Sequence, residues 1–190
     1  MFWIFSLGLG FGAALMMLPK AVAHLHAAGH ALHGKDTQSG PARAHTEEKF
    51  VFTAQAPMEQ VAPLFGADKE RVWSPQWDPQ FIYPLPVADA QGMVFTVAHH
   101  HLHAVWVNTE LNLKDGRVQY VYVIPDVLVT VITLNLKPDG NQTLVEVRYH
   151  RTALSPEADA HVQEMAKQDH DAGPEWQTQI NQYLEKHPGS

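Results

Sequence analysis

Histidine is the residue type with the most chemical potential in this chain of 190 residues, which contains 13 histidines and no cysteine. Four of the histidines lie in the run His99-His100-His101-Leu102-His103. On a β-strand, His99, His101 and His103 would share one face, because side chains alternate between the two faces. Three neutral imidazoles so placed can bind a transition metal. The alternative, which we favour, is a solvated polar loop.

A second histidine set lies near the N-terminus. If a helix continues through this region, His26, His30 and His33 fall on one helical face at positions i, i+4 and i+7. They can also chelate zinc, copper or nickel. The alternative is a polar, partly ionised stem beside a membrane, which we favour because no acidic residue at matching spacing supports the imidazoles. We therefore expect no cofactor and keep both histidine sets as candidate metal ligands only.

Aromatic side chains form a third group that can do chemistry, as the wall of a pocket. Pockets for apolar ligands are built from aromatic and aliphatic side chains with a few polar tips, such as tyrosine hydroxyls. For most aromatic residues core packing is the simpler interpretation. The candidates for a cavity wall are Trp73, Trp77, Tyr83, Phe95, Val107, Tyr120, Tyr149 and Trp176.

Signatures of catalysis and of nucleic-acid binding are absent from the sequence. It has no Gly-x-Ser-x-Gly elbow, no His-Glu-x-x-His motif and no phosphate-binding glycine loop. Glu146, Arg148 and His150 alternate along one expected strand, on the side opposite its apolar residues, and should point to solvent. The formal net charge of -7 argues against nucleic acid, because neutralising phosphates requires a basic patch. We assign no catalytic residue.

The N-terminal segment differs in character from the rest. Residues 2–18 carry no charge, which predicts a membrane anchor or a signal peptide, although a buried core helix is a third alternative. Ala21-Val22-Ala23 fits a signal-peptidase site and favours export. However, the first basic residue, Lys20, follows the apolar run, and this order favours an anchor with a cytoplasmic body. The side of the membrane that the body faces stays open.

Three segments follow from these patterns: a hydrophobic anchor or signal peptide over residues 1–23, a histidine-rich linker over 24–46, and a domain over 47–187. Within the domain, a strand at 49–55 precedes a short helical segment opened by Pro57 and an irregular, aromatic-rich crossing at 71–86. Turn residues then separate five strands with period 2, which predicts an antiparallel meander. These strands are expected at 93–98, 104–113, 117–124, 127–137 and 143–152.

A helix should close the domain. Ser155 and Pro156 are typical of a helix start, with a serine cap followed by proline. Apolar residues at helical spacing then continue almost to the C-terminus, with a kink expected at Gly173-Pro174.

The face of the strand at 104–113 that points inward decides which of its residues could line a ligand site. In the strand at 104–113, the alternation that contains Val105 and Val107 is the more apolar, so it should face the interior. Trp106 would then lie at the outer face or rim, and Phe95 is the safer cavity residue.

The domain resembles the START-like superfamily, also called SRPBCC, which includes polyketide cyclase/dehydrase and lipid-transport proteins. The resemblance rests on the element order and on four runs: RVWSPQWDPQFIYP, GMVFTV, AVWVNTEL and YHRTALSPE. It implies an α+β helix-grip fold, in which a curved antiparallel sheet wraps around a long C-terminal helix and a hydrophobic ligand lies between the two. It also implies that the run beginning at His99 lies at the tip of a hairpin.

These inferences favour a binding protein over an enzyme. We expect a membrane-associated or exported domain that holds a hydrophobic small molecule or lipid between sheet and helix, and does not bind nucleic acid. The alternatives are a cyclase/dehydrase-type enzyme acting on an apolar substrate and a histidine-based metal-handling protein. An inward pair of ionisable side chains about 3 Å apart would favour the enzyme.

The segment boundaries predict the effect of a truncation. A chain that starts at Ala44 should stay soluble and unfold at the same midpoint as the full chain, because the apolar segment lies outside the folded domain. Thermal and urea unfolding of the two chains, compared side by side, checks this. Loss of the folded domain on truncation would show that the segment is part of the core.

Overall fold

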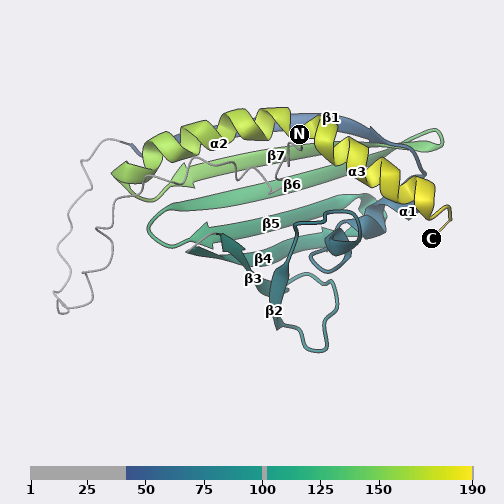
Figure 1. Cartoon of the computed structure of the whole chain (residues 1–190), viewed down its shortest axis with the longest axis horizontal. Helices are drawn as coiled ribbons and strands as arrows, with labels where there is room; N and C mark the ends of the chain where they lie inside the picture. Colours follow the sequence, from purple (N-terminus) through teal and green to yellow (C-terminus); the bar gives the residue numbers. More distant parts are fainter. Residues whose placement is uncertain (1–41, 100–101, 190) are drawn as a thin grey trace, which may run out of the picture.

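A single antiparallel sheet of seven strands dominates the computed structural model, which describes residues 42–99 and 102–189. The spatial order is β1-β7-β6-β5-β4-β3-β2, so the first strand of the chain pairs with the last (Figure 1). The strands are β1 (His45–Ala54), β2 (Pro79–Tyr83), β3 (Val94–His99), β4 (Leu102–Asn112), β5 (Arg117–Ile124), β6 (Leu128–Asp139) and β7 (Gln142–Ala153).

Two consecutive helices cover the β1 side of the sheet. Helices α2 (Asp159–Asp171) and α3 (Gly173–Lys186) follow one another along β1, and both contact it (Figure 1). The remaining helical elements are short: α1 (Met58–Val61) and the 3-10 helices η3 (Ala62–Leu64), η4 (Lys69–Val72), η5 (Leu113–Asp115) and η6 (Pro156–Ala158). The predicted α+β helix-grip architecture is confirmed.

Alternating burial shows why these segments form strands. In β5, β6 and β7 nearly every second residue is buried, so one face of the sheet lines the core and the other meets solvent. Glu146 and Arg148 lie on the outer face as expected and pair with each other at 2.8 Å. A register shift between Asn108 and Glu110 in β4 marks a bulge, which bends the strand and adds to the curvature of the sheet.

Two glycines make close approaches possible. Gly116 has φ 66°, and a Cβ there would lie 2.3 Å from the Leu136 carbonyl oxygen, so only glycine fits the turn before β5. At Gly173, where α3 begins, a Cβ would meet the Phe50 side chain at 3.2 Å. Pro174 follows in the first turn of α3, where its missing N–H is tolerated. The predicted break at Gly173-Pro174 therefore lets the two helices approach β1.

The observed elements differ from the expected ones in three places. The crossing at 71–86 contains a regular strand, β2, whose first residue Pro79 lies on the sheet edge, where a proline is tolerated. Ser155 makes no side-chain cap hydrogen bond, and the helix begins instead through the 3-10 turn η6. Strand β1 begins at His45, four residues before the strand expected at 49.

The face assignment for β4 is wrong. Trp106 is buried in the core, whereas Val105 is 41% exposed and Val107 lies on the same outer alternation. The ring of Trp106 stacks on Tyr122 with centroids 4.3 Å apart and on Phe95 at 5.7 Å. A tryptophan removes much more apolar surface from water than a valine does, so the face is set by Trp106 rather than by the number of apolar residues.

Membrane insertion concerns a part of the chain that the structure leaves undescribed. The apolar segment 2–18 and the candidate ligands His26, His30 and His33 all lie outside the described residues. Within the described ranges, no helix combines the length and the apolar character needed to span a membrane.

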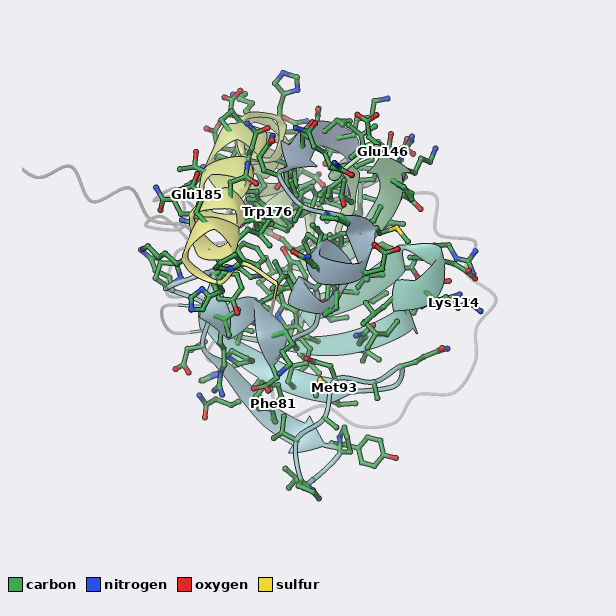
Figure 2. The ribbon with its side chains drawn as sticks, turned by 90° about the vertical axis from the view of Figure 1, so that its right-hand side faces the viewer. Phe81, Met93, Lys114, Glu146, Trp176 and Glu185 are labelled. Carbon is green, nitrogen blue, oxygen red and sulfur yellow. The ribbon has the colours of Figure 1, made fainter. Side chains whose placement is uncertain are left out.

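Packing of α3 yields a stability prediction. Trp176 is only 3% exposed and points from α3 toward the sheet (Figure 2), with its ring 5.5 Å from those of Phe50 and Trp73. Trp176→Ala should lower the free energy of unfolding by about 3–5 kcal/mol, because it leaves a cavity between helix and sheet. Urea unfolding measures this, with Leu85→Ala at a 70% exposed site as the control. A loss below about 0.5 kcal/mol would mean that α3 does not pack through Trp176.

Candidate functional site

A buried carboxyl group lies against the inner face of the sheet. The Tyr120 hydroxyl of β5 donates a hydrogen bond of 2.8 Å to Glu70 Oε1 in η4, and Glu70 is only 3% exposed. The two residues lie 50 positions apart in the sequence. This is an inward pair of ionisable groups at the separation that acid–base chemistry requires.

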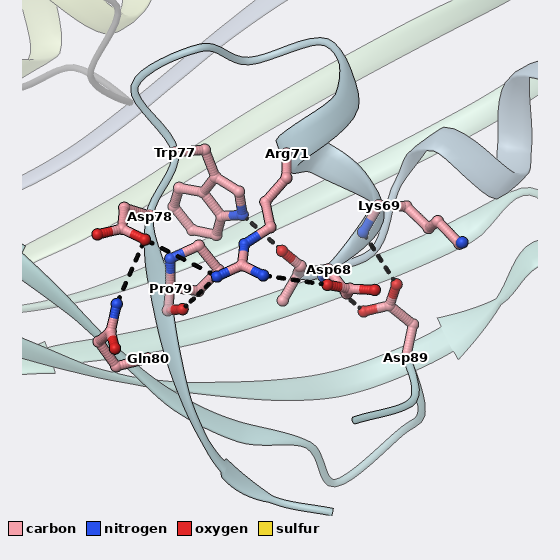
Figure 3. A network of polar contacts seen from close by, with 9 residues as sticks. Asp68, Lys69, Arg71, Trp77, Asp78, Pro79, Gln80 and Asp89 are labelled. Carbon is pink, nitrogen blue, oxygen red and sulfur yellow. Dashed lines mark hydrogen bonds and ion pairs between the residues drawn. The ribbon is translucent and has the colours of Figure 1, made fainter. Parts of the chain in front are cut away.

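Polar contacts on the solvent side fix the segment that carries Glu70 (Figure 3). The Asp89 carboxylate accepts hydrogen bonds from the backbone N–H groups of Asp68 and Lys69, at 2.9 and 3.1 Å. Arg71 donates to the Pro79 carbonyl at 3.2 Å and pairs with Asp68 at 3.5 Å. These contacts tie η4 to the first residue of β2 and to Asp89 beyond its end, and Glu70 is the buried member of η4.

Two tryptophans anchor the same segment from inside. Trp73 Nε1 donates to the Leu64 carbonyl at 2.9 Å, and Trp77 Nε1 donates to the Ala67 carbonyl at 2.7 Å. The Trp77 ring meets that of Trp106 edge-on at 5.3 Å. The indole N–H groups of Trp73 and Trp77 are therefore satisfied by the backbone of the chain.

Burial changes the acidity of Glu70. Removal from water raises its pKa to about 8, against a lowering by the Tyr120 hydrogen bond and a further rise caused by Asp89. The side chain is therefore protonated at neutral pH. A protonated carboxyl can donate a hydrogen bond to a ligand and can act as a general acid. Burial, with Glu70 nearby, also raises the pKa of Tyr120 well above its ordinary value.

A second buried polar group, which we call the Arg151 cluster, consists of Arg151, Asp169, Tyr122 and Thr130. The Arg151 guanidinium in β7 donates to both carboxylate oxygens of Asp169 in α2, at 2.5 and 2.6 Å. It also donates to Thr130 Oγ1 at 2.9 Å and to the Tyr122 hydroxyl. The cluster joins α2 to the three strands β5, β6 and β7.

Cross-strand register arranges these side chains in two adjacent rows on the inner face, about 7 Å apart because they are two residues apart along each strand. One row, from β3 to β7, consists of Phe95, Trp106, Tyr122, Thr130 and Arg151. The other, from β4 to β7, consists of Asn108, Tyr120, Ile132 and Tyr149. We call these the inner rows.

Two donors in the inner rows have no hydrogen-bond partner among the described residues: the Tyr149 hydroxyl and Trp106 Nε1. Both side chains are buried. The Arg151 guanidinium carbon lies 4.8 Å from the centre of the Tyr149 ring, which engages the face of the ring but not its hydroxyl. A buried donor without a partner costs about 1–3 kcal/mol.

The candidate cavity residues fall into two groups. Trp73, Phe95, Tyr120, Tyr149 and Trp176 are buried, and Trp77 is partly buried against them. Tyr83 is 61% exposed and Val107 lies on the outer alternation of β4, so neither belongs to the inner rows. A ligand role for the buried residues stays a prediction, because a core residue would be buried in the same way.

Sequence reasoning missed the charged members of the interior, Glu70, Arg151 and Asp169. For Arg151 a signal exists, since it is two residues beyond Tyr149 and so shares the inward face of Val147 and Tyr149. For Glu70 the sequence offers none. It lies between two basic residues, and only the fold brings it to Tyr120.

The described ends of the histidine run lie on two strands that pair with each other, β3 and β4. His99 ends β3, and His103 in β4 pairs across the strands with Ala98. His103 is exposed, and His101 lies outside the described residues.

A polar cleft of about 430 Å³ lies at the β1 edge of the sheet. Its walls carry both signs of charge. They consist of Glu47, Glu48, Lys49, Arg148, His150 and His170.

Comparison with known proteins gives similarity of fold without similarity of sequence. No protein-family model and no curated protein matches the chain. Norcoclaurine synthase from Thalictrum flavum, solved with dopamine and hydroxybenzaldehyde, superposes with a TM-score of 0.60 at 10% identity, over 86% of this chain and 100% of its own. Ara h 8.0201 gives 0.53 at 10% identity, over 76% and 100%. A protein from Thermobifida fusca, solved by NMR, gives 0.54 at 17% identity, over 74% and 95%.

These matches extend over nearly the whole of each solved structure. They show that the chain has the START/Bet v 1-like helix-grip fold expected from its sequence. At 10–17% identity they show the fold alone.

The raised pKa of Glu70 predicts an unusual dependence of stability on pH. Because the folded pKa of about 8 lies above the ordinary 4.5, the folded state holds the extra proton, and stability falls as pH rises from about 4.5 to 8. Glu70→Gln keeps an oxygen that accepts the Tyr120 hydrogen bond but has no charge to bury. Near pH 5 the variant and the native chain should be about equally stable. Near pH 9 the variant should be more stable by a few kcal/mol, because a difference of one in pKa corresponds to about 1.4 kcal/mol.

Urea unfolding at several pH values measures this, with Glu146→Gln as the control. The hydrogen bond from Arg148 lowers the pKa of Glu146, so its replacement should give no gain in stability at high pH. Parallel pH profiles for the native chain and Glu70→Gln would show that Glu70 is ionised at neutral pH.

Proposed function

We propose that this chain binds a small, largely aromatic or apolar molecule between the inner rows of the sheet and helices α2 and α3. The observation that carries the proposal is the pair of buried donors, the Tyr149 hydroxyl and Trp106 Nε1, without a partner among the described residues. A ligand with one or two polar atoms would satisfy them. Its apolar body would pack on the rings of Phe95, Tyr122 and Trp176.

The spacing of polar groups in the inner rows limits the size of such a ligand. Tyr120, bonded to Glu70, and Tyr149 belong to the same row on strands two apart, so their Cα atoms are separated by roughly 10 Å. A ring system with a polar group at each end spans this distance. The structurally similar norcoclaurine synthase was solved with two single-ring molecules, dopamine and hydroxybenzaldehyde, which supports this size class.

An acid–base enzyme is the second candidate, and one specific observation favours it. Glu70 and Tyr120 lie 2.8 Å apart in the interior, and the pKa of about 8 keeps Glu70 protonated at neutral pH. Such a carboxyl can protonate a carbonyl or leaving oxygen of a bound substrate. In this case Glu70→Gln would abolish turnover while leaving the affinity for the ligand nearly unchanged.

Membrane association or export is a separate part of the proposal. It is supported by the uncharged residues 2–18 alone, and the attachment would place the binding domain beside a membrane or carry it across one.

A binding experiment tests the interior site. We expect hydroxybenzaldehyde or the fluorescent fatty acid cis-parinaric acid to quench tryptophan fluorescence saturably, and the probe that binds more tightly identifies the ligand class. Tyr149→Phe should weaken binding about tenfold, because it removes one hydrogen bond of roughly 1–1.5 kcal/mol. Tyr83→Phe, at an exposed tyrosine, should leave the affinity unchanged.

A different outcome would contradict the proposed interior site. If neither probe binds at saturating concentration and Tyr149→Phe raises the free energy of unfolding, the unpaired hydroxyl is only a defect of packing and the interior holds no ligand.

A further inference from the structure

We propose that His45, Glu47 and His150 form a binding site for a divalent transition-metal ion, with zinc as the type that suits the donors. The site lies on the outer face of the sheet, on the side opposite the inner rows. Neither histidine is among the candidate metal ligands that the sequence offers, which lie at positions 26–33 and 99–103. Two imidazoles and one carboxylate are a donor set that zinc takes readily, with a further position open to water or an added ligand.

Strand pairing brings the three side chains together. In the antiparallel register of β1 and β7, Glu47 lies directly opposite His150, and His45 lies opposite Thr152. His45 and Glu47 are two residues apart on β1 and so share one face. The side chains of all three point to the outer face, where they are exposed or half-buried.

The distances suit a common ion. His45 Nε2 lies 3.6 Å from Glu47 Oε1, and His150 Nδ1 lies 3.4 Å from the same oxygen. All the ligand atoms fall within 4.8 Å of one another. Donors about 2.0–2.2 Å from a tetrahedral zinc are separated by roughly 3.3–3.6 Å. The two contacts to Glu47 already have that spacing, so only the two imidazoles must approach each other.

A neighbouring hydroxyl orients one of the ligands. The Nδ1 atom of His45 lies 2.9 Å from Thr152 Oγ1. When Nδ1–H donates this hydrogen bond, the lone pair of Nε2 faces Glu47, which is the tautomer that a metal requires. Partners of this kind hold metal-binding histidines in place, and their removal costs about 10–100-fold in affinity.

The surroundings indicate what completes the coordination. Glu47 and His150 also line the polar cleft, together with Lys49 and Arg148. Arg148 is already paired with Glu146 at 2.8 Å, so Lys49 is the one of the two that can attract an anion to the metal ion. The open coordination position therefore suits an anionic ligand, such as a carboxylate or phosphate group, held in the cleft.

The experiment must separate this site from the other histidines. We would use the full-length chain in which His24, His26, His30, His33, His99, His100, His101 and His103 are replaced by Asn, and titrate it with Co²⁺ and then Zn²⁺. We expect one equivalent of Co²⁺ to bind with the ligand-field absorption of a low-coordinate ion, and Zn²⁺ to displace it. His45→Asn, Glu47→Gln and His150→Gln, each in that chain, should abolish the signal.

Two further variants separate metal ligation from general surface charge. Thr152→Val should weaken Co²⁺ binding about tenfold, because it frees the His45 ring to rotate. His170→Asn, which changes a cleft residue outside the triad, should leave affinity unchanged. The inference is overturned if the substituted chain binds no Co²⁺, or binds it equally after Glu47→Gln. Titration of the otherwise native chain gives a second measurement, in which Glu47→Gln should remove one bound equivalent.

Discussion

A guanidinium with no exposed surface has to find partners for its charge and its N–H groups inside the protein. Arg151 finds them on α2, β5 and β6, through Asp169, Tyr122 and Thr130. Breaking such an ion pair from one side costs about 3–5 kcal/mol, because the remaining charge stays buried. Asp169 therefore fixes where α2 lies over the sheet, and α3 continues from α2 at the Gly173 approach to Phe50. The Arg151–Asp169 ion pair therefore sets the separation between the helices and the sheet.

The interior that results is aromatic in its walls but not uniformly apolar. Its polar groups differ in how many of their hydrogen-bond and charge partners are supplied by the protein itself. Arg151 is held by several partners, Glu70 is satisfied only as a neutral carboxyl, and the Tyr149 hydroxyl is not satisfied by any described residue. In the proposed function, the groups that the protein satisfies least are the ones that a ligand would contact.

Sequence patterns predicted the order and approximate bounds of the elements, because strand alternation and turn chemistry are local properties. β5, at Arg117–Ile124, agrees with its predicted range at both ends. The inward face of β4 depends on what packs across the sheet, and there Trp106 outweighed its valine neighbours. Glu70 and Tyr120 form a pair only through a contact 50 residues apart, and His45 meets His150 only once β1 pairs with β7. No local pattern records such contacts.

The pairing of the first strand with the last also determines the order in which the sheet can form during synthesis. The hydrogen bond between His45 and Thr152 spans 107 residues of chain. β1 therefore has no neighbour to join until β7 has left the ribosome, and contacts this distant form slowly. Helices α2 and α3 pack on the sheet later still, since both follow β7 in the chain. β1 therefore stays without a strand partner for most of translation, whereas β2 to β6 can each pair with the next strand of the chain as soon as it is made.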